Sequence, residues 1–187
     1  MNAFDNLEYF IATHENDLFS IVFFDLDRFN TYSQEDKTRL AHEVREFLNE
    51  QINSNKVQLF WAERDEFLLI MPGINKKQAK DFTDELLKKF AGFFKTDGLT
   101  CSAGIAQYPW DGRDAAELWR KAEEVLNKAK RCGRNRACIA EEKMVLRSNY
   151  YSPSQLERLR SLARYLSKSE AEILRESLEL FLKKYNV

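Results

Sequence analysis

A continuous apolar run, LFSIVFFDLD at residues 18–27, constrains the fold more than any other segment of the chain. Strands with one face in water alternate apolar and polar residues, whereas an unbroken apolar run is typical of a strand buried on both faces. The run therefore predicts a buried strand from Leu18 to about Asp25. Because it ends in acids, it places Asp25 and Asp27 at the carboxyl end of a central strand.

Further helices and strands are predicted along the chain. Apolar residues at helical spacing predict helices over 4–15, from about 40 to 52, and over 75–95. KVQLFWAE and DEFLLIMP are apolar segments on either side of a polar turn, which is typical of a β-hairpin with its tip near Glu63–Arg64. LTCSAGIAQYP predicts a strand, DAAELWRKAEEVLNKAK a helix that ends before Gly133, and RACIA a short edge strand.

The order helix, β-α-β-β-α-β and then α-β contains the split β-α-β arrangement of ferredoxin-like folds. It predicts an α+β domain over residues 1–140, in which an antiparallel sheet has one face covered by two helices. The chain has 187 residues, of which 44% are hydrophobic. This is enough for such a medium-sized domain together with one very small one.

Composition also bears on compartment and cofactors. The chain has no apolar run near roughly 18 residues, and its N-terminus carries acids where a signal peptide carries bases. We therefore expect a cytoplasmic protein with no membrane partner. The three cysteines lack a C-x-x-C spacing and are expected to be reduced thiols, in neither a disulfide framework nor a zinc site.

Residues 143–187 differ in charge from the rest of the chain. They contain 9 Lys and Arg against 5 Glu, a balance of +4, whereas residues 1–142 contain 20 against 25, a balance of −5. A basic tail predicts an anionic partner, and the alternative is a solvated helix surface. Capping boxes at Ser152–Gln155 and Ser167–Glu170 predict two helices after one short strand. So small a segment cannot bury its apolar faces alone, so it should dimerise or dock on the first domain.

Charged side chains gather where the predicted strands end. Asp65 and Glu66 follow the hairpin tip, and their carboxylates converge with Asp25 if the two strands are neighbours. Clustered acids repel each other unless a hard cation such as Mg²⁺ neutralises them. Lys130 and Arg134 lie at a helix end, where they would reach phosphates. This set favours a nucleoside triphosphate site, and the alternative is a group of solvent-facing loop charges.

Three segments resemble one known family in order and spacing: FFDLDRFN, FWAERDEFLLIMPG and CSAGIAQYPWDGRDAAELWRKAEEVLNKAKRCGRN. Through them, residues 1–140 resemble a GGDEF domain, the diguanylate cyclase fold. The resemblance implies a Mg²⁺ site made by the acidic residues Asp25, Asp65 and Glu66. It also implies that a bound nucleotide, GTP or cyclic di-GMP, contacts Asp25, Leu26, Glu63, Arg64, Lys130 and Arg134.

The chain departs from the family pattern at several functional positions. The two glycines of the signature are Glu63 and Arg64, although glycine there lets the backbone approach phosphates and adopt unusual dihedral angles. A Glu63 carboxylate beside a polyanion would cost about 1–4 kcal/mol, which Arg64 would partly offset. The residues that read guanine in the family fall at Ser33 and near His42. We therefore expect a degenerate domain that has no catalytic residues and retains nucleotide binding.

The stretch PSQLERLRSLARYLSKSEAEILRESLELFL, within residues 143–187, resembles ribbon-helix-helix domains. The resemblance implies an intertwined homodimer whose paired strands enter the major groove of double-stranded DNA. Base contacts would come from Arg147, Asn149 and Tyr151. Phosphate contacts at the start of the second helix would come from Ser167, Lys168 and Ser169. A one-residue slip in register would bury Arg147 and Asn149 instead, and a dimerisation hairpin that binds no DNA is the alternative.

The combined interpretation is a dimeric DNA-binding transcription regulator whose degenerate GGDEF domain senses a nucleotide. One alternative is a divergent diguanylate or nucleotide cyclase, in which the C-terminal dimer brings two nucleotide sites together. A second alternative is a non-catalytic dimerisation scaffold that binds neither ligand.

Overall fold

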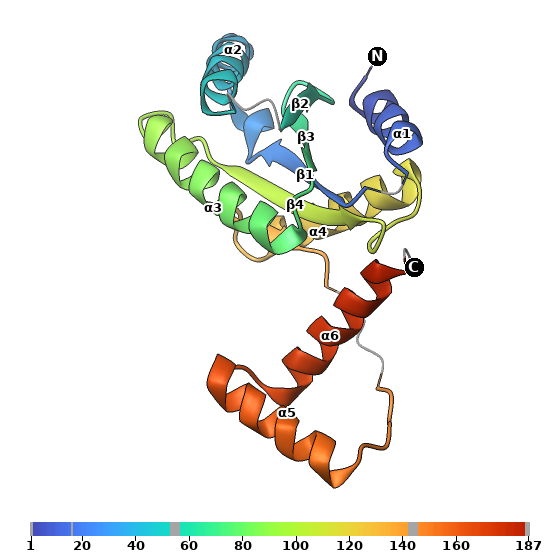
Figure 1. Cartoon of the computed structure of the whole chain (residues 1–187). Coiled ribbons are helices and arrows are strands. Elements are labelled where there is room, and N and C mark those ends of the chain that lie inside the picture. The colour runs from blue at the N-terminus through green and yellow to red at the C-terminus, as the bar shows by residue number, and fades with distance from the viewer. Residues whose placement is uncertain (1, 16, 53–56, 142–145, 186–187) are drawn as a thin grey trace. The chain divides into compact units, whose positions relative to one another are not determined.

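The chain forms two compact units, Met1–Glu142 and Lys143–Val187, in a computed structural model (Figure 1). The structure describes residues 2–15, 17–52, 57–141 and 146–185. Within these residues, no helix combines the length and the apolar character that crossing a lipid bilayer requires.

The first unit is built around a five-stranded sheet with the order β2-β3-β1-β4-β5. The strands are β1 (Phe19–Leu26), β2 (Gln58–Trp61), β3 (Glu66–Pro72), β4 (Cys101–Tyr108) and β5 (Ala137–Ile139). β1 is antiparallel to both β3 and β4, β2 is antiparallel to β3, and β5 runs parallel to β4 at the edge. The predicted α+β class is confirmed, and β1 is the central strand, buried along its whole length.

Helices cover both faces of this sheet (Figure 1). They are α1 (Ala3–Thr13), α2 (Gln34–Gln51), α3 (Lys76–Phe93) and α4 (Ala115–Arg131), with a short 3-10 turn, η1 (Phe29–Thr31), after β1. Alternate residues of β1 belong to two separate apolar clusters, one with α2 and α3 and the other with α1 and α4. The ferredoxin-like pattern predicts only the first of these layers, and the second explains why β1 is apolar on both faces.

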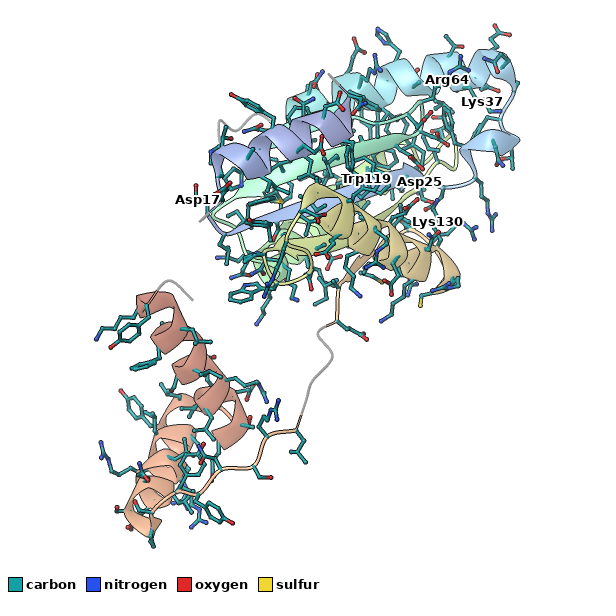
Figure 2. All side chains as sticks on the ribbon, turned by 90° about the vertical axis from the view of Figure 1, so that its right-hand side faces the viewer. Asp17, Asp25, Lys37, Arg64, Trp119 and Lys130 are labelled. Atoms are coloured by element: carbon teal, nitrogen blue, oxygen red, sulfur yellow. The ribbon has the colours of Figure 1, made fainter. Side chains whose placement is uncertain are left out.

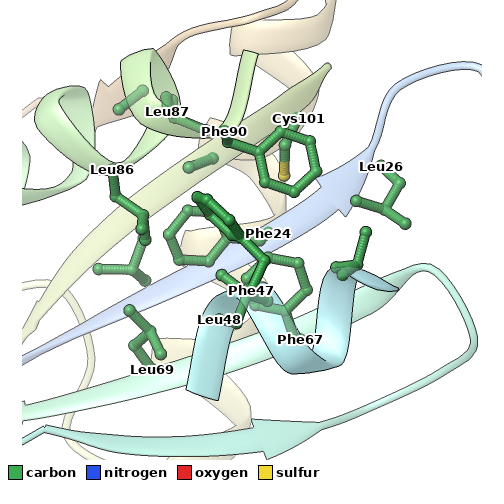
Figure 3. Close-up of a cluster of buried hydrophobic side chains, with 14 of the residues drawn as sticks. Phe24, Leu26, Phe47, Leu48, Phe67, Leu69, Leu86, Leu87, Phe90 and Cys101 are labelled. Carbon is green, nitrogen blue, oxygen red and sulfur yellow. The ribbon is translucent and has the colours of Figure 1, made fainter. Parts of the chain in front are cut away.

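The cluster beneath α2 and α3 joins both helices to the sheet (Figure 3). Phe24 of β1 stacks on Phe67 of β3, with 4.6 Å between the ring centroids. Phe47 of α2 meets Phe90 of α3 edge-on at 5.6 Å. Burying one large apolar side chain contributes about 1.5–3 kcal/mol, so this cluster fixes the carboxyl half of β1.

On the other face, Trp119 of α4 connects three elements (Figure 2). Its ring centroid lies 4.6 Å from that of Phe23 in β1 and 5.7 Å from that of Phe4 in α1. These contacts hold α4 against the sheet. The last turn of α4, which contains Lys130, is thereby brought to the carboxyl end of β1.

The second unit consists of α5 (Pro153–Leu166) and α6 (Glu170–Lys184). The predicted capping box at Ser152–Gln155 is confirmed. The sequence places the second box at Ser167–Glu170, but this prediction is wrong by two residues. The Oγ of Ser169 accepts the N–H of Glu172, whose carboxylate accepts the N–H of Ser169. Ser167 instead ends α5 in the left-handed conformation, at a φ of 53°.

Two helices alone do not enclose a core in this unit. Of its described apolar residues, Ala163 and Ile173 are buried, whereas Leu178 and Phe181 are 57% and 60% exposed. The predicted strand lies partly on residues 142–145, outside the described residues. Its described residues, 141 and 146–151, form no strand, because they are paired with no other strand in the single chain.

Candidate functional site

Carboxylates from two strands meet at one end of the sheet. Asp25 of β1 lies directly opposite Glu66 of β3 in the antiparallel register, so the two side chains share a face. The N–H of Leu26 donates to the carbonyl of Asp65 at 2.9 Å. Asp25 is buried, and Glu66 is half-buried. The hairpin therefore brings Asp65 and Glu66 next to Asp25, at the carboxyl end of the central strand.

Lys130 brings a positive charge to these acids from the last turn of α4 (Figure 2). Its Nζ lies 2.7 Å from Oδ2 of Asp25. Burial raises the pKa of Asp25, the hydrogen bond and charge of Lys130 lower it, and the charges of Asp65 and Asp27 raise it again. Burial is also the main cause of the raised pKa of Glu66, followed by the charges of Asp25 and Asp65. The ammonium group of Lys130 alone therefore does not balance the negative charge of these carboxylates.

The acids and bases border an open pocket of about 240 Å³. Its lining is Asp25, Leu26, Arg28, Phe29, Asn30, Asp65, Lys130 and Arg134. Among the predicted metal and nucleotide ligands, Glu63, Arg64 and Glu66 do not line it. Arg28, Phe29 and Asn30 were not predicted to line it. The chain enters this stretch through Arg28 in the left-handed conformation, at a φ of 56°, and continues as the η1 turn.

This acid and base set, at the carboxyl end of a central strand in a mixed sheet, has a counterpart among known proteins. The family model described as "Diguanylate cyclase, GGDEF domain" matches residues 3–136. The chain belongs to the GGDEF family.

Relatives of this GGDEF protein include enzymes of greater length. It is 27% identical over 176 residues to the bifunctional diguanylate cyclase/cyclic di-GMP phosphodiesterase MucR of Pseudomonas aeruginosa, a match that covers 89% of the chain and 25% of MucR. It is 26% identical over 137 residues to the cyclic di-GMP phosphodiesterase NbdA of the same organism, covering 69% of the chain and 17% of NbdA. The chain thus spans a quarter or less of the length of these relatives.

Solved GGDEF structures share the fold of the chain. The active GGEEF domain of a diguanylate cyclase from Vibrio cholerae superposes with a TM-score of 0.66 at 19% identity, over 75% of this chain and 95% of that one. The GGDEF domain of DgcB from Caulobacter crescentus, solved in complex with c-di-GMP, gives a TM-score of 0.64 at 18% identity, over 74% and 88%. At these identities the likeness establishes the fold alone.

The signature turn of this GGDEF domain, residues 62–65, uses backbone angles that are open to any residue. Glu63 and Arg64 are exposed, and neither is among the described non-glycine residues with a positive φ. The N–H of Glu63 donates to the carbonyl of Glu66 at 3.2 Å and so is not directed at a ligand. The turn therefore closes on Glu66 without the unusual dihedral angles that glycine allows, which agrees with the replacement of the two signature glycines by Glu63 and Arg64.

The donor set of the GGDEF pocket fits part of a Mg²⁺ shell. Asp25 in the pocket and Glu66 beside it offer carboxylate oxygens, which are the ligands that Mg²⁺ prefers, and burial together with neighbouring carboxylates raises the pKa of both. Among the described residues, no group of three or more His, Cys, Asp or Glu side chains is arranged to hold a metal ion. The carbonyl of Leu26, phosphate oxygens and water would have to complete the shell.

The positions that read guanine in other GGDEF domains have structural roles here. Ser33 caps α2: its Oγ accepts the N–H of Asp36 and donates to the Asp36 carboxylate at 2.7 Å. The His42 side chain is 73% exposed on α2, where its Nδ1 lies 3.5 Å from a carboxylate oxygen of Glu46. Neither residue lines the pocket.

The predicted DNA-contacting residues of the second unit fall into two groups. Arg147, Asn149 and Tyr151 are exposed in the segment before α5. At the start of α6, the Ser169 N–H donates to Glu172 at 2.8 Å, and the Lys168 Nζ donates to Glu176 at 2.6 Å. A phosphate at this helix start would have to displace Glu172. The predicted phosphate site at this helix start depends on free N–H groups, whereas the Glu172 side chain already caps the N–H of Ser169.

Replacing Glu66 by Gln should stabilise the metal-free chain at neutral pH. Because the pKa of Glu66 is raised above its usual 4.5, the folded state binds more protons than the unfolded state between 4.5 and the raised value. Stability therefore falls as the pH rises through that range. The expected gain at pH 7 is below about 1 kcal/mol, because solvent screens a half-exposed group.

This prediction is checked by thermal unfolding of both proteins between pH 4 and 7, in about 1 mM EDTA to remove divalent cations. The gain should disappear below pH 4.5, where Glu66 is protonated in both states. Glu8→Gln, on the exposed face of α1, is the control and should produce no such gain. A Glu66→Gln protein that is less stable than the wild type at pH 7 would show that the ionised carboxylate is stabilising.

Proposed function

We propose that the GGDEF domain of this chain binds a nucleotide, GTP or cyclic di-GMP, through its phosphates, and does not synthesise cyclic di-GMP. The observation that carries this proposal is the Asp25–Lys130 ion pair beside Glu66, on the wall of a pocket that Arg134 also lines. When bound, Mg²⁺ held by Asp25 and Glu66 would neutralise phosphate charge.

Phosphate binding is supported by the basic residues around the pocket. Lys130 and Arg134 come from the end of α4 and the turn that follows it, and Arg28 adds a third cation from the loop after β1. Charge-assisted hydrogen bonds from such groups are the stronger ones that proteins make with phosphate. A second hollow on the surface of α4, lined by Asn127, Lys130, Arg131 and Arg134, shares Lys130 and Arg134 with this pocket.

The lack of cyclisation is supported by the residues that position the substrate in the family. Glu63 replaces a signature glycine, and its N–H is already bonded within the turn. Ser33 is engaged as a helix cap, and His42 points away into solvent. Catalysis of condensation depends on holding two reactants within contact distance and in line. A nucleotide bound only through its phosphates lacks that orientation.

For the second unit, we propose pairing with a second copy as a ribbon-helix-helix homodimer. Apolar residues on α5 and α6, such as Leu162, Leu174, Leu178 and Phe181, are left exposed by the single chain. A partner of the same sequence presents the same apolar surface, so both copies bury it in one two-fold interface. The segment before α5 would then pair with its equivalent, which supplies the strand partner that the single chain lacks.

The partner proposed for this dimer is double-stranded DNA, which would make the chain a transcription regulator. The support is the +4 charge balance of residues 143–187, doubled in a dimer, and the exposure of Arg147 and Asn149 in the segment that would form the ribbon. The acids at the start of α6 oppose phosphate contact there. The proposed DNA affinity therefore rests on the ribbon residues.

Replacing Lys130 by Ala should weaken GTP binding about tenfold or more, because a charged hydrogen bond to phosphate is lost. Arg134→Ala should have a similar effect. Lys128→Ala is the matched control: it lies on the same helix, pairs with Glu141 and does not line the pocket, so GTP affinity should be unchanged. Calorimetric titration of GTP with Mg²⁺ measures the affinities, and circular dichroism verifies the fold of each variant.

The same titrations distinguish the competing functions. Equal losses in Lys130→Ala and Lys128→Ala would show that GTP does not occupy this pocket. Cyclic di-GMP in the reaction mixture, detected by mass spectrometry, would establish the divergent cyclase instead. Absence of any nucleotide binding by the wild-type chain would support the alternative of a non-catalytic dimerisation scaffold.

A further inference from the structure

Asp27 is a buried acid that does not line the pocket, although it lies two residues from Asp25. Its carboxylate accepts hydrogen bonds from separate parts of the chain. The Thr100 hydroxyl donates to Oδ2 at 2.8 Å, and the Ser102 hydroxyl donates to Oδ1 at 2.7 Å. The backbone N–H of Asn135 donates to Oδ2 at 3.0 Å. The first two bonds reach β4 and the residue before it, and the third reaches the turn after α4.

That turn has an unusual backbone. Gly133, Arg134 and Asn135 have consecutive positive φ values of 112°, 61° and 47°. Residues with a Cβ rarely adopt this left-handed region, and they stay there only when surrounding contacts hold them. The N–H of Arg134 donates to the carbonyl of Ala129 at 3.1 Å, which closes the end of α4. On the other side of Arg134, the N–H of Asn135 donates to Asp27, and the Nε of Arg136 donates to the carbonyl of Arg134 at 3.1 Å.

We infer that Asp27 is a positioning residue that holds the Gly133–Asn135 turn in its left-handed form and thereby sets Arg134 in the pocket. The Nε of Arg134 lies 3.8 Å from Oδ1 of Asp27, so the same carboxylate also attracts the side chain that it positions. The inference rests on the proposed function, in which Arg134 binds a nucleotide phosphate. Asp27 itself touches no ligand.

A carboxylate is required for this role because each of the three groups hydrogen-bonded to Asp27 donates a hydrogen to it. Asparagine has nearly the same size and keeps one oxygen, but it replaces the other with an NH₂ group that cannot accept. Whichever oxygen it replaces, this NH₂ group faces a donor of the turn, either the backbone N–H of Asn135 beside Oδ2 or the Nε of Arg134 beside Oδ1, whereas the hydroxyls of Thr100 and Ser102 can rotate and accept from it. Asp27→Asn therefore affects the turn more than it affects β4.

The test is calorimetric binding of GTP with Mg²⁺ to the full chain. Asp27→Asn should weaken binding about tenfold, as Arg134→Ala does, because Arg134 loses its position. In the Arg134→Ala background, Asp27→Asn should have no further effect. Thr100→Val and Ser102→Ala, which remove the other bonds to Asp27, should keep the wild-type affinity. Multiplicative losses in the Asp27→Asn/Arg134→Ala double variant would overturn the inference.

A rescue variant separates positioning from general damage to the fold. Glycine adopts a left-handed φ without steric cost, so Asn135→Gly reduces the need for the Asp27 bond. The double variant Asp27→Asn/Asn135→Gly should recover most of the lost GTP affinity. If Asp27→Asn alone does not fold, this double variant decides the question. A folded double variant that binds GTP as weakly as Arg134→Ala would contradict the inference.

Amide hydrogen exchange without nucleotide tests the turn independently of the proposed function. Asp27→Ala, which leaves no acceptor for the Asn135 N–H, should accelerate exchange of that N–H about tenfold or more, and Thr100→Val should not. If the wild-type chain binds no GTP while this acceleration is observed, the proposed function fails and the role of Asp27 in the turn stands. Unchanged exchange at Asn135 in Asp27→Ala would overturn the positioning role whatever the binding result.

Discussion

Replacing Gly104 by Ala should destabilise the chain by about 2 kcal/mol or more, because the new methyl group has no space. Gly104 lies in β4 beneath α4, and a Cβ there would be 2.1 Å from the carbonyl oxygen of Ala122 and 2.3 Å from the backbone nitrogen of Leu126. Both are backbone atoms of a helix, so no side-chain rotation relieves the overlap. α4 would have to move away from the sheet, and Lys130 would move with it.

Urea unfolding measures this loss, and GTP titration of the folded fraction measures its effect on the pocket. Gly92→Ala is the matched control, because a Cβ at this position in α3 meets nothing within 4 Å. Alanine favours a helix over glycine, so the control should be unchanged or slightly more stable. A Gly104→Ala protein as stable as the wild type would mean that α4 does not pack on β4 as closely as described.

Replacing Leu178 by Glu should convert the chain from a dimer into a monomer. In the proposed dimer Leu178 is buried between the two copies, and burying an unpaired carboxylate costs several kcal/mol. The dimer dissociation constant should therefore rise about 100-fold or more. Sedimentation equilibrium at several concentrations measures this change. Specific DNA binding in a gel-shift titration should be lost in parallel, because the ribbon requires two chains.

Leu180→Glu is the matched control for this prediction. Leu180 is on the same helix and is 72% exposed, but two residues correspond to roughly 200° of helical rotation, which places it nearly opposite Leu178. It should remain dimeric. A wild-type chain that is monomeric, or equal dissociation in both variants, would contradict the proposed interface. Dimerisation without any salt-dependent DNA binding would support the alternative that this unit only dimerises and binds no DNA.

Much of the fold could be predicted from the sequence because burial leaves a pattern there. The apolar run through Phe23 and Phe24 identified the central strand, and the two apolar segments on either side of a polar turn at residues 62–65 identified the hairpin. The second layer of helices was not predicted, because the ferredoxin-like pattern accounts for one face only. The position of the second capping box was also missed, since both Ser167 and Ser169 precede an acid by three residues and only the structure shows which serine is the cap.

Prediction of the site was limited by loop geometry. Asp25, Asp65 and Lys130 could be grouped because each lies at the end of a predicted strand, hairpin or helix. Arg28 could not be assigned to the site from the sequence. It reaches the pocket through a left-handed backbone conformation, and a single arginine carries no sequence signal for that conformation. The position of Asp27 beneath the turn after α4 depends equally on tertiary packing.

The central claim is that this GGDEF domain binds a nucleotide phosphate at Asp25, Lys130 and Arg134 and leaves it chemically unchanged. It is tested most directly by titrating GTP with Mg²⁺ into the full chain in a calorimeter and analysing the same sample by mass spectrometry after prolonged incubation. We expect saturable binding and recovery of intact GTP without cyclic dinucleotide. Formation of cyclic di-GMP, or a titration without any binding heat across several temperatures, would contradict it.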